Sequence, residues 1–151
     1  MTSRFFVSIA AVIAVGAGAR SLLPRPASTA ATVTVYKSPS CGCCAKWVDH
    51  LRGAGFTVVV HDTDNLDEVK TDFAVPRQLA SCHTAKVGTY VIEGHVPADL
   101  IAKVLREHPA IAGLAVPGMV AGSPGMEGGA AQHYDVMAWS AAGQTSVYAR
   151  R

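Results

Sequence analysis

The motif Cys-Gly-Cys-Cys at positions 41–44 constrains this chain more than any other feature. It follows a short β-branched strand signal at 32–36 and opens an amphipathic helical pattern at 44–54. Because Cys41 and Cys44 are three residues apart, their sulfurs share one face at a helix start and can bind a metal or form a disulfide. The positive end of the helix dipole stabilises thiolates there. The motif therefore predicts metal or redox chemistry at the junction of a strand and a helix.

The rest of the chain alternates strand and helix signals before its composition changes. A segment of 17 residues, 113–129, is rich in Gly and Pro, has no periodicity and is too long for an ordinary connection. The order of elements indicates an α/β domain whose first two strands are parallel with a right-handed crossover. The further elements that we expect are a strand at 56–61, apolar throughout and therefore central, a short helix at 66–73, an irregular segment at 76–88, a strand at 89–93, a helix from Pro97 to 107, and a late strand pair at 134–139 and 145–148.

The N-terminus resembles an export signal. Arg4 precedes an uncharged, largely apolar stretch at 5–19, which is shorter than the roughly twenty residues of a spanning helix, and small residues follow it. We expect a cleaved signal peptide, with a retained membrane anchor as the alternative, and a periplasmic location in either case. The predicted organisation is a leader and linker at 1–31, an α/β domain at 32–112 and a C-terminal extension at 113–151.

The charge balance excludes an electrostatic nucleic-acid surface. From Thr32 onward the chain has ten Lys or Arg residues against eleven Asp or Glu residues, with no basic run. We expect a monomer that does not bind nucleic acid.

The spacing of the cysteines argues against two simple disulfides. Four cysteines in an oxidising compartment normally form two bridges, but Cys43 and Cys44 are adjacent, and at most one of the three clustered cysteines pairs comfortably with Cys82. A dithiol oxidoreductase gains nothing from Cys43, whereas thiolates suit Cu(I), and several sulfurs together can bridge more than one copper ion. Zinc sites usually use two separated ligand pairs instead.

Further candidate ligands lie outside the motif. His95 precedes a helix, and Met119 and Met126 lie in the Gly/Pro-rich segment, where exposed thioethers have little packing purpose but bind Cu(I). His83 is a weaker candidate, because it follows Cys82 directly and consecutive side chains point apart in an extended chain. We expect no metal-binding role for the remaining candidates, which are His50, His61, His108, His133 and Glu127, and we expect Trp47, Met137 and Trp139 in the core.

Five segments together resemble the CopG-type Cys-x-Cys-Cys copper-resistance family of Gram-negative bacteria. The resemblance extends from Val33 to Trp139 and is carried by residues 35–44, 81–84, 93–97, 113–119 and 122–127. It implies a thioredoxin-like domain with a C-terminal extension that contributes to metal binding. It also implies a cysteine-bridged cluster of several copper ions and a role in interconverting Cu(I) and Cu(II) during copper detoxification.

The sequence thus predicts an exported copper-binding protein that serves copper resistance, with copper ions and periplasmic copper-efflux components as partners. The predicted metal ligands are Cys41, Cys43, Cys44, Cys82, His95, Met119 and Met126. Two alternatives stay open. One is a thiol–disulfide oxidoreductase that uses Cys41 and Cys44, which the absence of proline at 86–88, before the expected third strand, disfavours. The other is a passive copper store or chaperone, so the sequence leaves enzymatic turnover undecided.

Overall fold

The computed structural model describes residues 31–151, so the predicted signal peptide and the linker before Ala31 lie outside the described part of the chain. Within that part, no helix is both long and apolar enough to cross a membrane.

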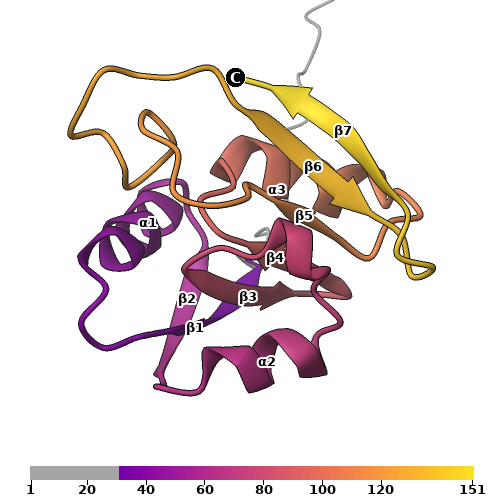
Figure 1. The fold of residues 1–151 in the computed structure, drawn as a ribbon, viewed down its shortest axis with the longest axis horizontal. Coiled ribbons are helices and arrows are strands. Elements are labelled where there is room, and N and C mark those ends of the chain that lie inside the picture. The colour runs from indigo at the N-terminus through magenta and orange to yellow at the C-terminus, as the bar shows by residue number, and fades with distance from the viewer. Residues whose placement is uncertain (1–30) are drawn as a thin grey trace, which may run out of the picture.

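The described residues form one mixed sheet of seven strands with three α-helices (Figure 1), which confirms the predicted α/β class. The strand order is β2-β1-β3-β4-β5-β6-β7. The pairs β1–β2 and β4–β5 are parallel, and the other pairs are antiparallel. The elements are β1 (Thr32–Lys37), α1 (Gly42–Gly53), β2 (Thr57–Asp62), α2 (Leu66–Asp72), the 3-10 turn η1 (Arg77–Leu79), β3 (His83–Val87), β4 (Tyr90–Glu93), α3 (Ala98–Glu107), β5 (Gly113–Ala115), β6 (Asp135–Trp139) and β7 (Thr145–Arg150).

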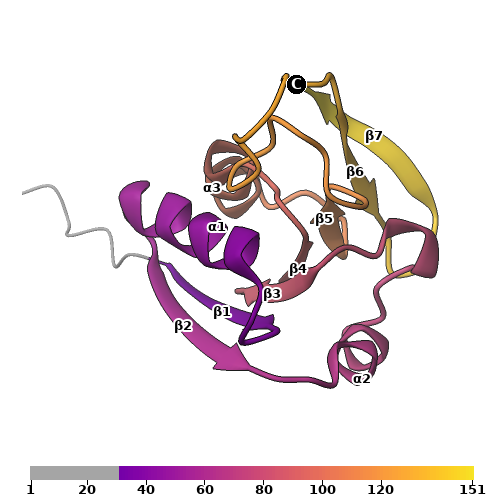
Figure 2. The same ribbon diagram turned by 60° about the vertical axis from the view of Figure 1, so that its left-hand side comes forward.

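Helices cover both faces of the first four strands. Figure 2 shows α1 and α3 on one face and α2 on the other, an arrangement compatible with the expected thioredoxin-like domain. The main core lies between β1, α1 and α3, where Val35, Trp47 and Ile101 are fully buried. The parallel pairing of β1 and β2 around α1 places the first residues of α1 beyond the carboxyl end of β1, where the cysteine motif lies.

The prediction that the second strand is central is wrong, because β2 forms one edge of the sheet. Its alternate residues Val58 and Val60 pack against the core, whereas the Val59 side chain points outward and is 43 % exposed. A run of β-branched residues reflects strand propensity, and this propensity does not distinguish a strand with two neighbours from a strand with one.

The prediction of an irregular segment at 76–88 is also wrong. It contains η1 and then β3, which pairs with both β1 and β4 and is largely buried. A tight turn at Gly88, whose φ is +56°, connects β3 to β4.

The Gly/Pro-rich segment begins with a short strand that the sequence did not reveal. Gly113 starts β5, and a side chain there would collide with the ring of Trp139 and the carbonyl oxygen of Val91. The late strands pair antiparallel as predicted, and β5 joins them to the rest of the sheet. Trp47 and Trp139 are buried as expected, whereas Met137 is only partly buried.

Candidate metal centre

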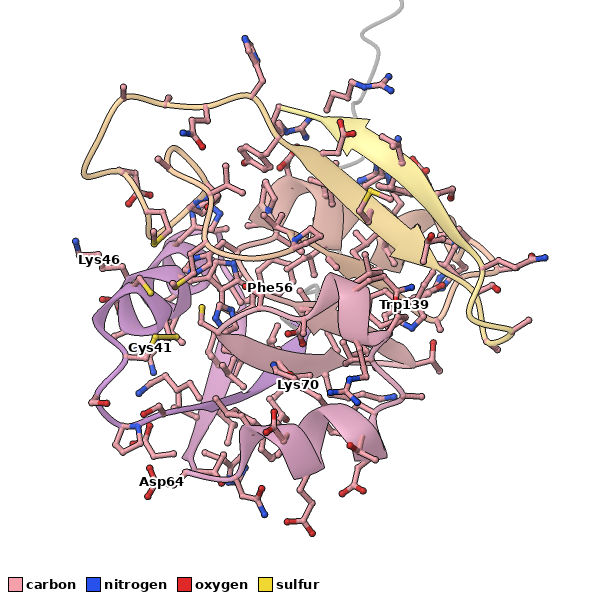
Figure 3. All side chains as sticks on the ribbon, in the orientation of Figure 1. Cys41, Lys46, Phe56, Asp64, Lys70 and Trp139 are labelled. Atoms are coloured by element: carbon pink, nitrogen blue, oxygen red, sulfur yellow. A yellow bond between two sulfur atoms is a disulfide. The ribbon has the colours of Figure 1, made fainter. Side chains whose placement is uncertain are left out.

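The cysteine motif lies at the N-terminus of α1, with Cys41 as the N-cap residue. In this structure Cys41 and Cys44 form a disulfide, and Cys43 and Cys82 are free thiols. The Sγ atom of Cys43 lies 3.5 Å from that of Cys41, and the Sγ atom of Cys44 lies 3.8 Å from the carbonyl oxygen of Cys82. Figure 3 shows the disulfide beside Cys41 and other sulfur atoms close to α1.

Cys82 joins the three cysteines of the motif although it lies 38 residues beyond Cys44 in the chain. All four Sγ atoms lie within 4.8 Å of one another, and only Cys44 is fully buried. Cys82 reaches the group because it directly precedes β3, the strand that pairs with β1. The structure therefore contains one compact group of four sulfur atoms, of which those of Cys41 and Cys44 are bonded to each other in the disulfide.

A buried carboxylate holds the Cys82 segment in place. The backbone N–H of Ser81 donates to the Glu93 carboxylate at 2.6 Å, and Lys70 Nζ and the Thr84 hydroxyl donate to the same carboxylate at 2.7 Å each. The Ser81 hydroxyl also donates to the carbonyl oxygen of Gly118 in the Gly/Pro-rich segment. Burial, followed by the nearby Cys43, raises the pKa of the Cys82 thiol to about 11, so a metal that binds this sulfur must displace a proton.

His95 lies beside Cys82 in a tautomer that suits metal binding. Its Nδ1 atom lies 2.7 Å from the carbonyl oxygen of Pro124, and its Nε2 atom lies 3.0 Å from Cys82 Sγ. Because a carbonyl oxygen can only accept, Nδ1 carries the hydrogen, and the lone pair of Nε2 points toward the sulfur. Metal-binding histidines are usually oriented in this way by a partner on the second ring nitrogen.

His83 is the functional candidate that sequence reasoning underrated. Its ring is fully buried, with Nδ1 3.4 Å from Cys82 Sγ, and its Nε2 atom is buried without a hydrogen-bond partner. The expectation that consecutive side chains point apart does not apply, because Cys82 precedes β3 and His83 is its first residue. Cys82, His83 and His95 thus form a second group whose donor atoms lie within 4.8 Å of one another.

Burial keeps both imidazoles neutral. It is the main cause that lowers the pKa of His95, and together with the neighbouring His95 it places the pKa of His83 well below its usual value. Neutral imidazole is the form that binds metals.

The loop after β5 closes over the start of α1. A Cβ atom on Gly125, whose φ is +88°, would lie 2.7 Å from the carbonyl oxygen of Cys43 and 3.3 Å from His95 Nδ1. Met126 lines a surface pocket together with Cys43 and Lys46. Met119 does not line this pocket, and its side chain is 61 % exposed. The structure therefore brings Met126, but not Met119, to the cysteines.

The other histidines and Glu127 have local roles. His50 Nε2 accepts a hydrogen bond from the backbone N–H of Ala98 at the start of α3, and His61 stacks on Tyr36. Glu127 is exposed, as expected, and its carboxylate accepts a hydrogen bond from the N–H of Gly125. His108 ends α3 in the left-handed conformation, and His133 is exposed.

The fold and this group of residues define a class: a small α/β protein with a cysteine cluster compatible with metal binding. Two solved structures have the same architecture. One, titled copper resistance protein copG, form 2, is 41 % identical, has a TM-score of 0.77, and is matched over 81 % of this chain and 98 % of its own. Form 1 of the same protein is 42 % identical, has a TM-score of 0.75, and is matched over 80 % and 96 %.

The chain belongs to the CopG copper-resistance family, which confirms the resemblance seen in the sequence. The model of a family described as a protein of unknown function, DUF411, matches residues 79–126, a range that includes Cys82, His83, His95, Met119 and Met126 but not the Cys-Gly-Cys-Cys motif. No curated protein sequence matches the chain.

Proposed function

We propose that this chain is an exported, periplasmic protein of copper resistance that binds several copper ions in a cluster bridged by its cysteines. The observation that carries the proposal is the gathering of the Sγ atoms of Cys41, Cys43, Cys44 and Cys82 within 4.8 Å of one another. Soft thiolates favour Cu(I), and closely spaced sulfurs can each bind more than one copper ion. The disulfide between Cys41 and Cys44 must first gain two electrons from an external thiol reductant, which gives the two thiolates that the cluster uses.

We assign the remaining ligands to His95, Met126 and Met119. His95 Nε2 points at Cys82, and Met126 lines a pocket with Cys43. Met119 would join only when the exposed part of its loop folds inward, since it lies outside that pocket. Thioethers favour Cu(I), whereas imidazole also binds Cu(II), so this mixed set supports interconversion of the two oxidation states. Copper-efflux components of the periplasm are the proposed partners, and the proposed state is a monomer.

We also propose the domain organisation that the sequence predicts. Residues 1–31 form the leader and linker, residues 32–112 the thioredoxin-like domain, and residues 113–151 the extension that contributes to the metal centre. The hydrogen bond between His95 and the carbonyl oxygen of Pro124 supports this role of the extension.

An anaerobic Cu(I) titration of the fully reduced protein tests the cluster. We expect at least two copper ions per chain by metal analysis, and Cys43→Ser should lose most of them. Ala45→Ser is the matched control, because it introduces the same side chain at an exposed position of α1 and should bind copper like the wild type. Fewer than two copper ions per reduced wild-type chain would disprove the cluster.

A thiol–disulfide oxidoreductase is the second candidate, favoured by the Cys41–Cys44 disulfide at the start of α1. The third strand of the sheet is β3, so the residues before it are Ala80, Ser81 and Cys82 instead of 86–88, and they too contain no proline. Efficient insulin reduction by the metal-free protein, retained in Cys43→Ser, would favour this candidate over the copper protein.

A further inference from the structure

We propose that the disulfide-bonded form of this protein binds one divalent transition-metal ion at a separate site made of Cys82, His83 and His95. The inference goes beyond the copper cluster and rests on the proposed function only in that both sites use Cys82 and His95. It adds His83 as a ligand and makes the oxidised protein competent to bind metal.

The geometry of the three donors fits a single ion. Cys82 Sγ lies 3.0 Å from His95 Nε2 and 3.4 Å from His83 Nδ1. Metal–sulfur bonds of about 2.3 Å and metal–nitrogen bonds of about 2.0–2.1 Å place neighbouring donors roughly 3 to 4 Å apart in a tetrahedral site. The donor atoms of the two imidazoles lie within 4.8 Å of each other, so the three donors need only a local adjustment to surround one ion.

The ring of His83 is held rigidly by its neighbours. Its ring packs against Trp47, with centroids 4.4 Å apart, and against His95 at 5.0 Å, so its orientation is fixed. Its Nε2 atom is nevertheless buried with no hydrogen-bond partner, which proteins normally avoid. The atom that faces Cys82 is the other ring nitrogen, Nδ1, and the fixed ring holds it beside the sulfur, where it can bind a metal.

The disulfide separates this site from the sulfur cluster. With Cys41 and Cys44 bonded to each other, the only free thiols of the described residues are Cys43 and Cys82. Cys43 belongs to the group of four sulfurs and not to the group that contains the two imidazoles. The oxidised protein thus presents one thiolate and two imidazoles, a set that suits Zn²⁺, Co²⁺ or Cu²⁺ better than Cu(I).

Anaerobic titration of the oxidised full chain with Co²⁺ tests the site, after thiol counting has confirmed two free thiols. We expect one Co²⁺ per chain with a thiolate-to-cobalt charge-transfer band. His83→Phe, which keeps a ring between Trp47 and His95, and His83→Gln should each weaken binding at least tenfold. The exposed His133→Phe should bind like the wild type, and Cys43→Ser should not weaken binding. Absence of Co²⁺ binding, binding unchanged in both His83 variants, or binding lost in Cys43→Ser would overturn the proposal.

A second measurement needs no substitution in the buried site. Zn²⁺ should slow alkylation of Cys82 in the oxidised wild type at least tenfold and leave alkylation of Cys43 unchanged, as peptide mass spectrometry can show. Protection of Cys43 instead of Cys82 would overturn the proposal. Both experiments use the oxidised protein and divalent ions, so their outcome is independent of the Cu(I) titration of the reduced protein.

Discussion

At the scale of single residues, the position of His95 depends on a loop residue much further along the chain. The carbonyl oxygen of Pro124 fixes its tautomer, and the next residue, Gly125, packs against the backbone of α1 in a left-handed conformation. The loop therefore orients a proposed ligand without binding the metal through these two residues.

Gly125→Ala should release this support. Its Cβ atom would approach the Cys43 carbonyl oxygen to 2.7 Å, so the loop must move and the Pro124 hydrogen bond should weaken. Loss of such a supporting contact lowers metal affinity about 10- to 100-fold. Competition for Cu(I) with a calibrated chelator measures the effect. Gly128→Ala is the control, because its Cβ atom would meet nothing within 4 Å, and equal affinities of the two variants would refute the role of the loop.

Lys70 and Glu93 form a buried ion pair beneath the Cys82 segment. The Nζ–Oε1 distance is 2.7 Å, the carboxylate is fully buried, and the Lys70 side chain is 13 % exposed. Burial is the main cause that raises the pKa of Glu93. Such pairs add little net stability, but they are costly to break because one charge is left buried without its partner.

Lys70→Met should destabilise the protein by about 3–5 kcal/mol in urea unfolding. The double variant Lys70→Met/Glu93→Gln should recover part of this loss, because it also removes the negative charge of Glu93, which is otherwise buried without a partner. Lys103→Met is the control, since its ion pair with Glu107 is exposed and 4.0 Å long, and we expect a change of about 0–1 kcal/mol. A Lys70→Met variant as stable as Lys103→Met would contradict this view of the pair.

Sequence reasoning identified Cys82 and His95 as candidates but gave His83 little weight. Cys82 lies in the segment before an expected strand, close to the expected position of the Cys-x-x-Cys pair, and His95 directly precedes a helix, so both positions indicate a site. The proximity of His83 to Cys82 depends on where β3 begins, which is set by its pairing with β1 and β4 and leaves no local signal.

At the scale of elements, local patterns predicted α1 and α3 well and strand neighbours poorly. α1 buries Trp47, Val48 and Leu51 on one face, a helical spacing that the sequence shows directly. The neighbours of β2 follow from the tertiary pairing of β1 with β3, so the sequence of β2 could not reveal that it is an edge strand. β3 is hard to predict because the alternation in its His-Thr-Ala-Lys-Val sequence covers only four residues and includes Ala and Lys, which are depleted in strands.

The outward orientation of Val59 on β2 has a testable consequence. Val59 is 43 % exposed, whereas Val35 on the neighbouring β1 faces the core and is fully buried. Val59→Thr should therefore change the free energy of unfolding by less than about 0.5 kcal/mol. Val35→Thr, with the same shape change, should cost about 1–3 kcal/mol, because it buries a hydroxyl group. Urea unfolding of both variants checks the assignment, and equal losses would contradict an outward orientation of Val59.

At the scale of the whole molecule, stability without metal should depend on the neutral state of the buried histidines. The pKa values of His83 and His95 are lowered in the folded protein. As the pH falls below the unfolded histidine pKa of about 6.5, the unfolded chain takes up protons that the folded protein does not. The stability present above this pH should therefore be lost as the pH falls toward the lowered values.

Urea unfolding of the chelator-treated protein at pH 7.5 and 5.5 measures this effect. Each buried histidine should contribute a loss of at most about 1.4 kcal/mol per pH unit below 6.5, and His83, with the more strongly lowered pKa, should contribute more than His95. His83→Phe should show a loss smaller by roughly 1 kcal/mol, and the exposed His133→Phe should lose as much as the wild type. An equal loss in His83→Phe would show that His83 already binds a proton in the folded state.

The two donor groups of this molecule have Cys82 in common. The copper cluster needs Cys41 and Cys44 as thiolates, whereas the proposed imidazole site belongs to the disulfide-bonded protein. Because both use the sulfur of Cys82, the redox state of the Cys41–Cys44 pair decides which kind of ion the molecule holds.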